Sequence, residues 1–170
     1  MNYTIRPIRI EDASDINEIY TMDEVRENIL GLFSERINQT EEFINSLGQN
    51  QYHMVAEADE NGVKKVVGTI SLTVSQTPRT RHTASLGIMV HKDYQGKGIG
   101  TALLNKILDL ADNWLMLVRV ELNVFVENET AVGLYKTHGF QIEGTKKYAA
   151  VRNGKYADEY LMARYRNLVM

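Results

Sequence analysis

The stretch that decides the fold lies near the middle of the chain, where glycines separate two different hydrophobic patterns. It reads Val90-His91-Lys92-Asp93-Tyr94-Gln95-Gly96-Lys97-Gly98-Ile99-Gly100-Thr101. Before it, residues 84–90 alternate in polarity as a strand does, and after it residues 99–114 follow a helical period. Glycine permits positive φ and leaves room for backbone N–H groups to approach a ligand, and the following helix offers its unpaired N–H groups. This stretch therefore predicts a strand-to-helix loop that holds a pyrophosphate.

The segments on either side of this loop predict a mixed α/β fold. Their order is strand, one or two helices, three strands, helix, strand, helix and two strands. The strands are expected over 3–6, 52–57, 66–74, 84–90, 120–124, 141–148 and 156–165, and the helices over 11–20, 40–48, 99–114 and 130–136. Residues 21–39 are expected to hold at least one short helix. We predict an antiparallel meander followed by a strand-helix-strand crossover, flanked by helices.

Length and composition restrict the functions that need to be considered. The 170 residues suit one domain, 1–170, because neither a linker nor an internal repeat divides them. The net charge of -3 gives no attraction for nucleic acid. No segment has the length and hydrophobicity of a membrane span or an export signal, so we expect no membrane partner. The absence of cysteine excludes a thiol nucleophile and suits a cytoplasmic location.

Two familiar phosphate-binding motifs do not fit the glycine loop. A P-loop requires Lys-Ser or Lys-Thr after its last glycine, which this stretch lacks. A dinucleotide-binding fingerprint requires a third glycine where Thr101 stands, and it belongs to an early strand-helix-strand unit rather than to a meander. The pattern Q/R-x-x-G-x-G/A fits at every defined position through Gln95, Gly98 and Gly100.

A second stretch begins 28 residues after Gly100, at Asn128, and continues to Phe140. It fits the pattern N-x-x-A-x-x-x-Y-x-x-x-G-F through Asn128, Ala131, Tyr135, Gly139 and Phe140. Local structure accounts for most of it: Asn128 suits a helix N-cap, Gly139 suits the residue after a helix, and Phe140 can anchor the next strand. Tyr135 has no such local explanation.

Together the two stretches and the order of elements resemble the GNAT family of N-acetyltransferases over nearly the whole chain. The sequence after Gly139 is similar to the branch that acts on amino acids, polyamines and ribosomal-protein N-termini. The resemblance implies acetyl-CoA as co-substrate and a GNAT-like sheet in which a splayed strand pair holds the acyl-CoA. The acceptor left open is an amino acid or other small amine, a polyamine or a protein N-terminus. A rival from another class is a non-catalytic acyl-CoA sensor, which the presence of Tyr135 and Asn128 disfavours.

The resemblance also implies roles for particular residues. The loop binds the pyrophosphate through the backbone, and a strand before it contacts the pantetheine and the thioester carbonyl. The residues expected to bind acetyl-CoA are Ile88, Met89, Val90, Gln95, Gly96, Lys97, Gly98, Ile99, Gly100, Thr101 and Asn128. Lys97 suits a phosphate contact or an exposed loop lysine equally well. Tyr135 is expected to protonate the departing thiolate, and a buried structural tyrosine is the alternative.

The general base is not marked in the sequence. No cysteine and no Ser-His pair points to a covalent intermediate, so we expect direct attack by a primary amine. Before it can attack, the ammonium group must lose a proton to a base. Several residues are candidates, and a chain of water molecules is equally acceptable. They are Asp23, Glu24, His53, His82, Glu121 and Glu159.

Three further expectations concern metals, aromatic residues and partners. The four histidines lack metal-ligand spacing, so no metal is predicted. Aromatic residues run through the last two strands, and alternate ones are expected in the core while the rest cover the acceptor or form a contact in a homodimer. They are Tyr148, Tyr156, Tyr160 and Tyr165. The partner predicted most directly is a small-molecule amine substrate.

Overall fold

The computed structural model describes residues 2–166. The chain folds into two compact units: the first comprises Met1–Leu72 and Gly87–Ile107, and the second comprises Thr73–Leu86 and Leu108–Met170. Seven strands are hydrogen-bonded in the order β1-β2-β3-β4-β5-β7-β6. The pairs β1–β2, β5–β7 and β6–β7 are antiparallel, whereas β4–β5 is parallel. The predicted mixed α/β class with a mostly antiparallel sheet is therefore confirmed.

The bounds of the elements follow the predicted order. The strands are β1 (Asn2–Pro7), β2 (Gln51–Glu60), β3 (Val63–Val74), β4 (Thr83–Val90), β5 (Arg119–Phe125), β6 (Gln141–Arg152) and β7 (Lys155–Tyr165). The α-helices are α1 (Ala13–Thr21), α2 (Asp23–Arg26), α3 (Ile37–Asn45), α4 (Ile99–Asp109) and α5 (Glu129–Thr137). Short 3-10 turns are η1 (Ile10–Asp12), η2 (Pro78–Thr80) and η3 (Lys92–Tyr94), and η4 (Leu110–Trp114) is a π-helical turn after α4.

One helical prediction changes at its start, and another is confirmed. Helix α3 begins at Ile37 rather than near Thr40, because the Gln39 side chain accepts a hydrogen bond of 3.0 Å from the Arg36 N–H and caps the first turn. The short helix expected within residues 21–39 is α2, which has 4 residues.

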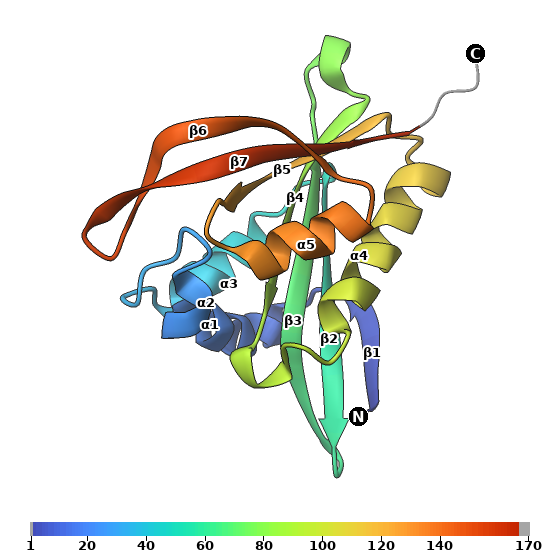
Figure 1. The fold of residues 1–170 in the computed structure, drawn as a ribbon. Helices are drawn as coiled ribbons and strands as arrows, with labels where there is room; N and C mark the ends of the chain where they lie inside the picture. Colours follow the sequence, from blue (N-terminus) through green and yellow to red (C-terminus); the bar gives the residue numbers. More distant parts are fainter. Residues whose placement is uncertain (1, 167–170) are drawn as a thin grey trace. The chain divides into compact units, whose positions relative to one another are not determined.

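The first unit builds its core between the helices and the β1–β2–β3 strands, which run side by side (Figure 1). Ile16 and Ile19 lie on one face of α1 and are buried in a cluster with Val55 of β2 and Val66 of β3. A buried carboxylate, Asp12, fixes the start of α1, because it accepts hydrogen bonds from the Arg6 guanidinium at 2.8 and 2.9 Å. Both carboxylate oxygens are thus paired, as a buried charge requires.

A single glycine lets helix α4 approach the sheet of the first unit. A Cβ on Gly68 of β3 would lie 3.2 Å from side-chain atoms of both Ile99 and Leu103. These two residues of α4 are almost fully buried. The N-terminal end of α4 is therefore packed tightly, and the loop that precedes it has a rigid support.

The second unit contains the predicted crossover and a long terminal hairpin. The beginning of β4 pairs in parallel with β5, from Thr83 opposite Arg119 to Ser85 opposite Glu121. Strand β7 pairs along the whole of β5, and Figure 1 shows β6 and β7 as the long hairpin at the red end of the chain. Phe140 and Met162 are buried in this unit.

The expected burial of alternate tyrosines on this hairpin is wrong. Tyr148 and Tyr156 are 76% and 72% exposed, Tyr165 is 47% exposed, and Tyr160 is partly buried. The alternation fails because the β6–β7 register shifts twice, between Ile142 and Gly144 and again between Lys146 and Ala150. Tyr148 adopts a φ of 51° at the second irregularity and forms an edge-to-face pair with Tyr156.

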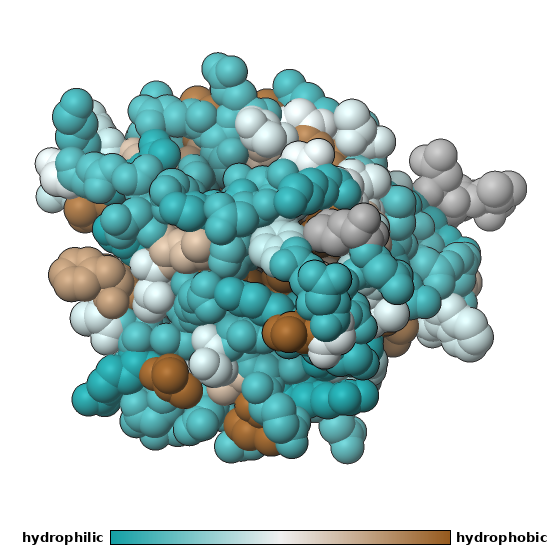
Figure 2. Space-filling view, turned by 90° about the horizontal axis from the view of Figure 1, so that it is seen from below, coloured by the Kyte–Doolittle hydropathy of each residue, from teal (hydrophilic) through white to brown (hydrophobic). Residues whose placement is uncertain are grey.

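The surface is largely hydrophilic on the face that Figure 2 shows, and the hydrophobic residues exposed there are scattered rather than gathered in a continuous patch. Within residues 2–166, no helix is both long enough and apolar enough to cross a bilayer.

Candidate active site

The glycine loop has a backbone conformation that only glycine adopts readily. After η3, Gly96 and Gly98 have φ values of 71° and 82°, and α4 begins at Ile99. A Cβ at either glycine would meet no heavy atom within 4 Å, so the space beside the backbone is open. The Gln95 side chain folds back and donates a hydrogen bond of 3.0 Å to the Val90 carbonyl. The two glycines thus leave main-chain N–H groups accessible beside the positive end of α4.

Lys97 provides positive charge at the same loop. Its ammonium group lies 5.0 Å from the centroid of the Tyr94 ring, and the Tyr94 hydroxyl donates a hydrogen bond of 2.8 Å to Glu60. That hydrogen bond raises the pKa of Tyr94, so the ring stays neutral beside the cation. Backbone N–H groups, a helix N-terminus and a lysine together suit a phosphate group.

A buried histidine that the sequence reasoning did not assign holds the beginning of the loop. His91 is 4% exposed, and its Nδ1 accepts a hydrogen bond of 3.2 Å from the Asp93 N–H. Its Nε2 therefore carries the proton and donates to Glu18 of α1 at 3.3 Å. Glu18 also binds Lys65 at 2.8 Å, and the hydrogen bonds from Lys65 and then His91 lower its pKa. A signal for this role was available in the sequence, since a histidine directly before a turn can cap it.

The end of β4 leads directly into the glycine loop and lies with it in the first unit. Ile88, Met89 and Val90 are partly buried. A Cβ on Gly87 would lie 3.2 Å from the hydroxyl oxygen of Ser71, which also donates a weak hydrogen bond of 3.4 Å to the Gly87 carbonyl. Gly87 therefore permits a close approach between β3 and β4.

A cavity of about 340 Å³ opens beside this segment, entirely within the first unit. Gly87, Ile88 and Met89 form part of its wall. The rest of the wall is mostly apolar, and it includes Ile8, Ile16, Tyr20, Ile29 and Phe43. Polar groups come from Glu35, Gln39, Thr40, His53, Thr69 and Ser71. No lysine or arginine belongs to the wall formed by the described residues. The sequence reasoning missed this cavity as a whole, because its wall comes from segments far apart in the chain.

The second motif lies in the second unit, where its local structure is as predicted. The Asn128 side chain accepts a hydrogen bond of 3.2 Å from the Ala131 N–H and caps α5. Gly139 has a φ of 87° after the end of α5, and Phe140 is buried. Tyr135 is 6% exposed, and its ring meets that of Phe140 edge to face at 5.8 Å. Burial raises the pKa of Tyr135 to about 12, so its hydroxyl keeps its proton at neutral pH.

The structure separates the candidates for the general base. Asp23, Glu24 and Glu121 form ion pairs with Arg26, Lys92 and Arg119, respectively. His82 is exposed and Glu159 is partly buried, both in the second unit. His53 is the one predicted candidate on the wall of the cavity in the first unit, as far as the described residues show. Within residues 2–166, no group of three potential metal-ligating side chains lies close enough to share an ion.

A backbone loop for phosphates, joined through one strand to an apolar cavity, is the arrangement of an enzyme that holds a nucleotide-containing donor and a small acceptor. Comparison with known proteins supports this interpretation of the site. The model of the acetyltransferase (GNAT) family matches residues 14–140. The L-amino acid N-acetyltransferase AaaT of Escherichia coli is 43% identical over 122 residues, which are 66% of this chain and 75% of that protein.

Two comparisons concern spermidine acetyltransferases. A spermidine N(1)-acetyltransferase of Vibrio cholerae is 29% identical over 154 residues, which cover 89% of this chain and 87% of that protein. The crystal structure of a Vibrio cholerae spermidine N-acetyltransferase with CoA and spermine matches with a TM-score of 0.83 and 26% identity, over 96% of this chain and 95% of that one. The chain belongs to the GNAT family of acetyltransferases and is an N-acetyltransferase. The family resemblance drawn from the two motifs is confirmed.

Proposed function

We propose that this enzyme moves the acetyl group of acetyl-CoA to the primary amine of an amino acid or another small amine by direct attack. The observation that carries the proposal is the glycine loop, where two residues with positive φ open the backbone at the start of α4. This arrangement fits the pyrophosphate of the CoA moiety. The loop residues from Gln95 to Thr101 would bind that group, with Lys97 adding a charge contact.

The donor site extends along β4 in this proposal. The backbone of Ile88, Met89 and Val90 would bind the pantetheine, and a main-chain N–H of this segment would polarise the thioester carbonyl, as the family resemblance implies. Asn128 is retained as a residue of the donor site on the same basis. Its observed hydrogen bond caps α5, so its contribution would come through the position of that helix.

The cavity of the first unit would receive the acceptor. Two of the three residues proposed to bind the pantetheine, Ile88 and Met89, are part of its wall, so an amine in the cavity lies beside the thioester that they would hold. Its apolar surface suits an amine with an apolar body. Glu35 is the single carboxylate on the wall among the described residues, which favours one ammonium group over a polyamine with several. The similarity to AaaT supports an amino acid in particular.

Tyr135 would give a proton to the thiolate as the carbon–sulfur bond breaks. A thiol has a pKa of about 8.5. The pKa of Tyr135, raised to about 12 by burial, makes the transfer uphill, so we expect a modest contribution rather than an essential one.

The first test is calorimetric titration with acetyl-CoA, followed by a thiol-release screen of amino acids, polyamines and short peptides. Micromolar binding and CoA release with amino acids would support the proposal. Release with spermidine or with peptides alone would replace the proposed acceptor by a polyamine or a protein N-terminus. Absence of acetyl-CoA binding would overturn the assignment of the loop.

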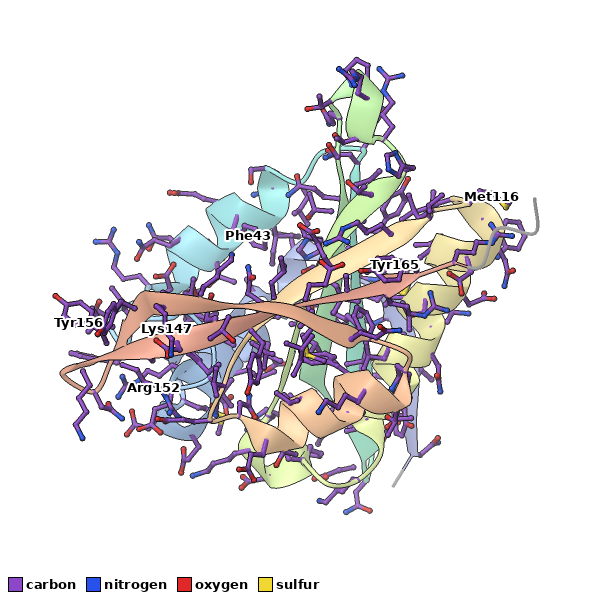
Figure 3. The ribbon with its side chains drawn as sticks, turned by 45° about the horizontal axis from the view of Figure 1, so that its top comes forward. Phe43, Met116, Lys147, Arg152, Tyr156 and Tyr165 are labelled. Carbon is purple, nitrogen blue, oxygen red and sulfur yellow. The ribbon has the colours of Figure 1, made fainter. Side chains whose placement is uncertain are left out.

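The proposal also covers the domain organisation, the location and the oligomeric state of the protein. We propose that residues 1–170 work as one acetyltransferase domain, and the family match supports this because it runs through both compact units. We also propose a cytoplasmic location, which suits a protein without cysteine. A homodimer is supported by the exposed aromatic residues of the β6–β7 hairpin, where Figure 3 shows Tyr156 near the tip. Sedimentation of the purified protein would test the oligomeric state.

A further inference from the structure

His53 of β2 lies half-buried on the wall of the cavity. Its backbone is fixed, because the carbonyl accepts a hydrogen bond of 3.1 Å from the Ile8 N–H. Its ring is fixed by an edge-to-face contact with Phe43 of α3, at 5.5 Å between centroids. Neither ring nitrogen has a hydrogen-bond partner among residues 2–166. No side-chain nitrogen or oxygen of this range is both unpartnered and sealed from solvent, so these nitrogens are accessible.

The histidine is also held in the form that can accept a proton. Burial lowers the pKa of His53 below its usual range, so the ring is neutral at pH 7. The other titratable side chains on the cavity wall are Tyr20 of α1 and Glu35, which precedes α3. Burial and the nearby charge of Glu35 raise the pKa of Tyr20, which therefore stays neutral. The strands β3 and β4 contribute only Thr69, Ser71 and the segment Gly87–Met89 to this wall, none of which titrates.

We propose that His53 is the general base that takes a proton from the ammonium group of the acceptor, a role that rests on the proposed function of the cavity. Its accessible ring shares the wall with Ile88 and Met89, whose backbone would hold the thioester. The competing carboxylates Asp23, Glu24 and Glu121 are occupied by ion pairs. Glu35 lies on the same wall, where it is the single carboxylate among the described residues. Its negative charge suits attraction of the ammonium group instead.

The proton balance is complete without another reactant. His53 takes one proton from the ammonium group, and the free amine attacks the thioester carbonyl. As the tetrahedral intermediate collapses, the carbon–sulfur bond breaks and Tyr135 gives its proton to the thiolate. The nitrogen loses its second proton to solvent, and Tyr135 regains one from solvent. The products are the amide, CoA with a free thiol and one proton, which His53 releases to solvent.

The test compares the pH dependence of kcat in the wild type and in His53→Gln, with the amine that the wild type acetylates. In the wild type, kcat should level off near neutral pH, above the lowered pKa of His53. In His53→Gln we expect a fall of roughly 10²–10⁴-fold at pH 7, and kcat should keep rising toward the pKa of the amine, roughly 8 to 10. Added imidazole should restore part of the activity of His53→Ala, because it can enter the space left by the ring.

Glu35→Gln is the matched control, since it removes the single carboxylate that the described residues place on the cavity wall. It should raise the KM for the amine while keeping the level region of the kcat profile. Acetyl-CoA affinity and melting temperature, measured for each variant, report folding and the donor site. A level region that persists in His53→Gln, or that disappears in Glu35→Gln, would overturn the proposal. Wild-type activity tests the proposed function separately, because it does not depend on which group accepts the proton.

Discussion

The glycine loop and the cavity of the first unit offer two opposite kinds of binding surface. The loop presents backbone: its key features are the φ values of Gly96 and Gly98 and the start of α4. The cavity presents side chains, from rings such as Phe43 and His53 to the carboxylate of Glu35. One surface is contiguous in sequence and the other is assembled from residues 8 to 89.

This contrast teaches how each substrate can be recognised. The contacts of a backbone site do not depend on side chains that a substitution could replace. Such a site therefore suits the part of a substrate that never varies, the pyrophosphate of CoA. A side-chain site can be altered one residue at a time without disturbing its neighbours, so it suits an acceptor that differs between relatives. Substitutions should therefore divide into those that harm the donor alone and those that harm the acceptor alone.

The largest effect on substrate affinity should come from Gly98→Asp, which tests the backbone side of the contrast. An aspartate at a φ of 82° strains the loop and places a negative charge where the pyrophosphate would bind. We expect acetyl-CoA affinity to fall by at least about 100-fold, on the order of 3 kcal/mol. Calorimetry measures this directly. Gly98→Asn carries the same shape without the charge and should lose much less, whereas unchanged affinity in Gly98→Asp would refute the phosphate loop.

Tyr135→Phe should affect turnover while leaving both binding surfaces intact. We expect kcat to fall roughly ten- to a hundredfold. Because burial raises the pKa of Tyr135 to about 12, the hydroxyl stays protonated and the loss should be the same from pH 6 to pH 9. Tyr160→Phe on β7 is the control and should keep full activity. Full activity of Tyr135→Phe over this range would leave Tyr135 with a structural role.

Phe43→Ala tests the side-chain surface. The ring is 46% exposed yet borders the cavity and His53, so its loss should raise the KM for the amine about tenfold without changing acetyl-CoA affinity. Figure 3 shows Phe43 on α3. Steady-state kinetics with each substrate varied in turn measures both quantities. Phe33→Ala, which removes an exposed ring stacked on Arg26, should change neither; an equal loss of donor affinity in Phe43→Ala would contradict the division.

The smallest effect is expected for Lys97→Ala, the one side chain proposed to assist the backbone loop. An exposed charge contact in water should be worth about threefold in acetyl-CoA affinity, and less at high salt. Titrations at two ionic strengths provide the measurement. Lys92→Ala is the comparison, because Lys92 is already paired with Glu24 at 3.0 Å. If the two variants behave alike, Lys97 is an ordinary surface lysine.

The loop and the order of elements could be predicted because their causes are local. Positive φ at Gly98, the Asn128 cap and the end of α5 at Gly139 each depend on residues a few positions apart. Hydrophobic periodicity gave the strands and helices for the same reason. The family was therefore predictable from two short motifs and their setting.

The cavity and the terminal hairpin could not be predicted because their causes are not local. The role of His53 depends on Phe43, on β4 and on the absence of a hydrogen-bond partner in the described chain, none of which its neighbours in sequence reveal. The exposure of Tyr148 and Tyr156 follows from two register shifts between β6 and β7. The cap that His91 forms is local, but its second contact, with Glu18 on α1, is not.

Helix α1 links the two surfaces physically. Glu18 on this helix binds the histidine at the base of the glycine loop, and Ile16 and Tyr20 of the same helix border the cavity. The helix has only 9 residues, and its buried face packs in the core of the first unit. A displacement of α1 on donor binding would therefore change the acceptor wall as well. Thermodynamic linkage then requires each substrate to alter the affinity of the other by the same factor.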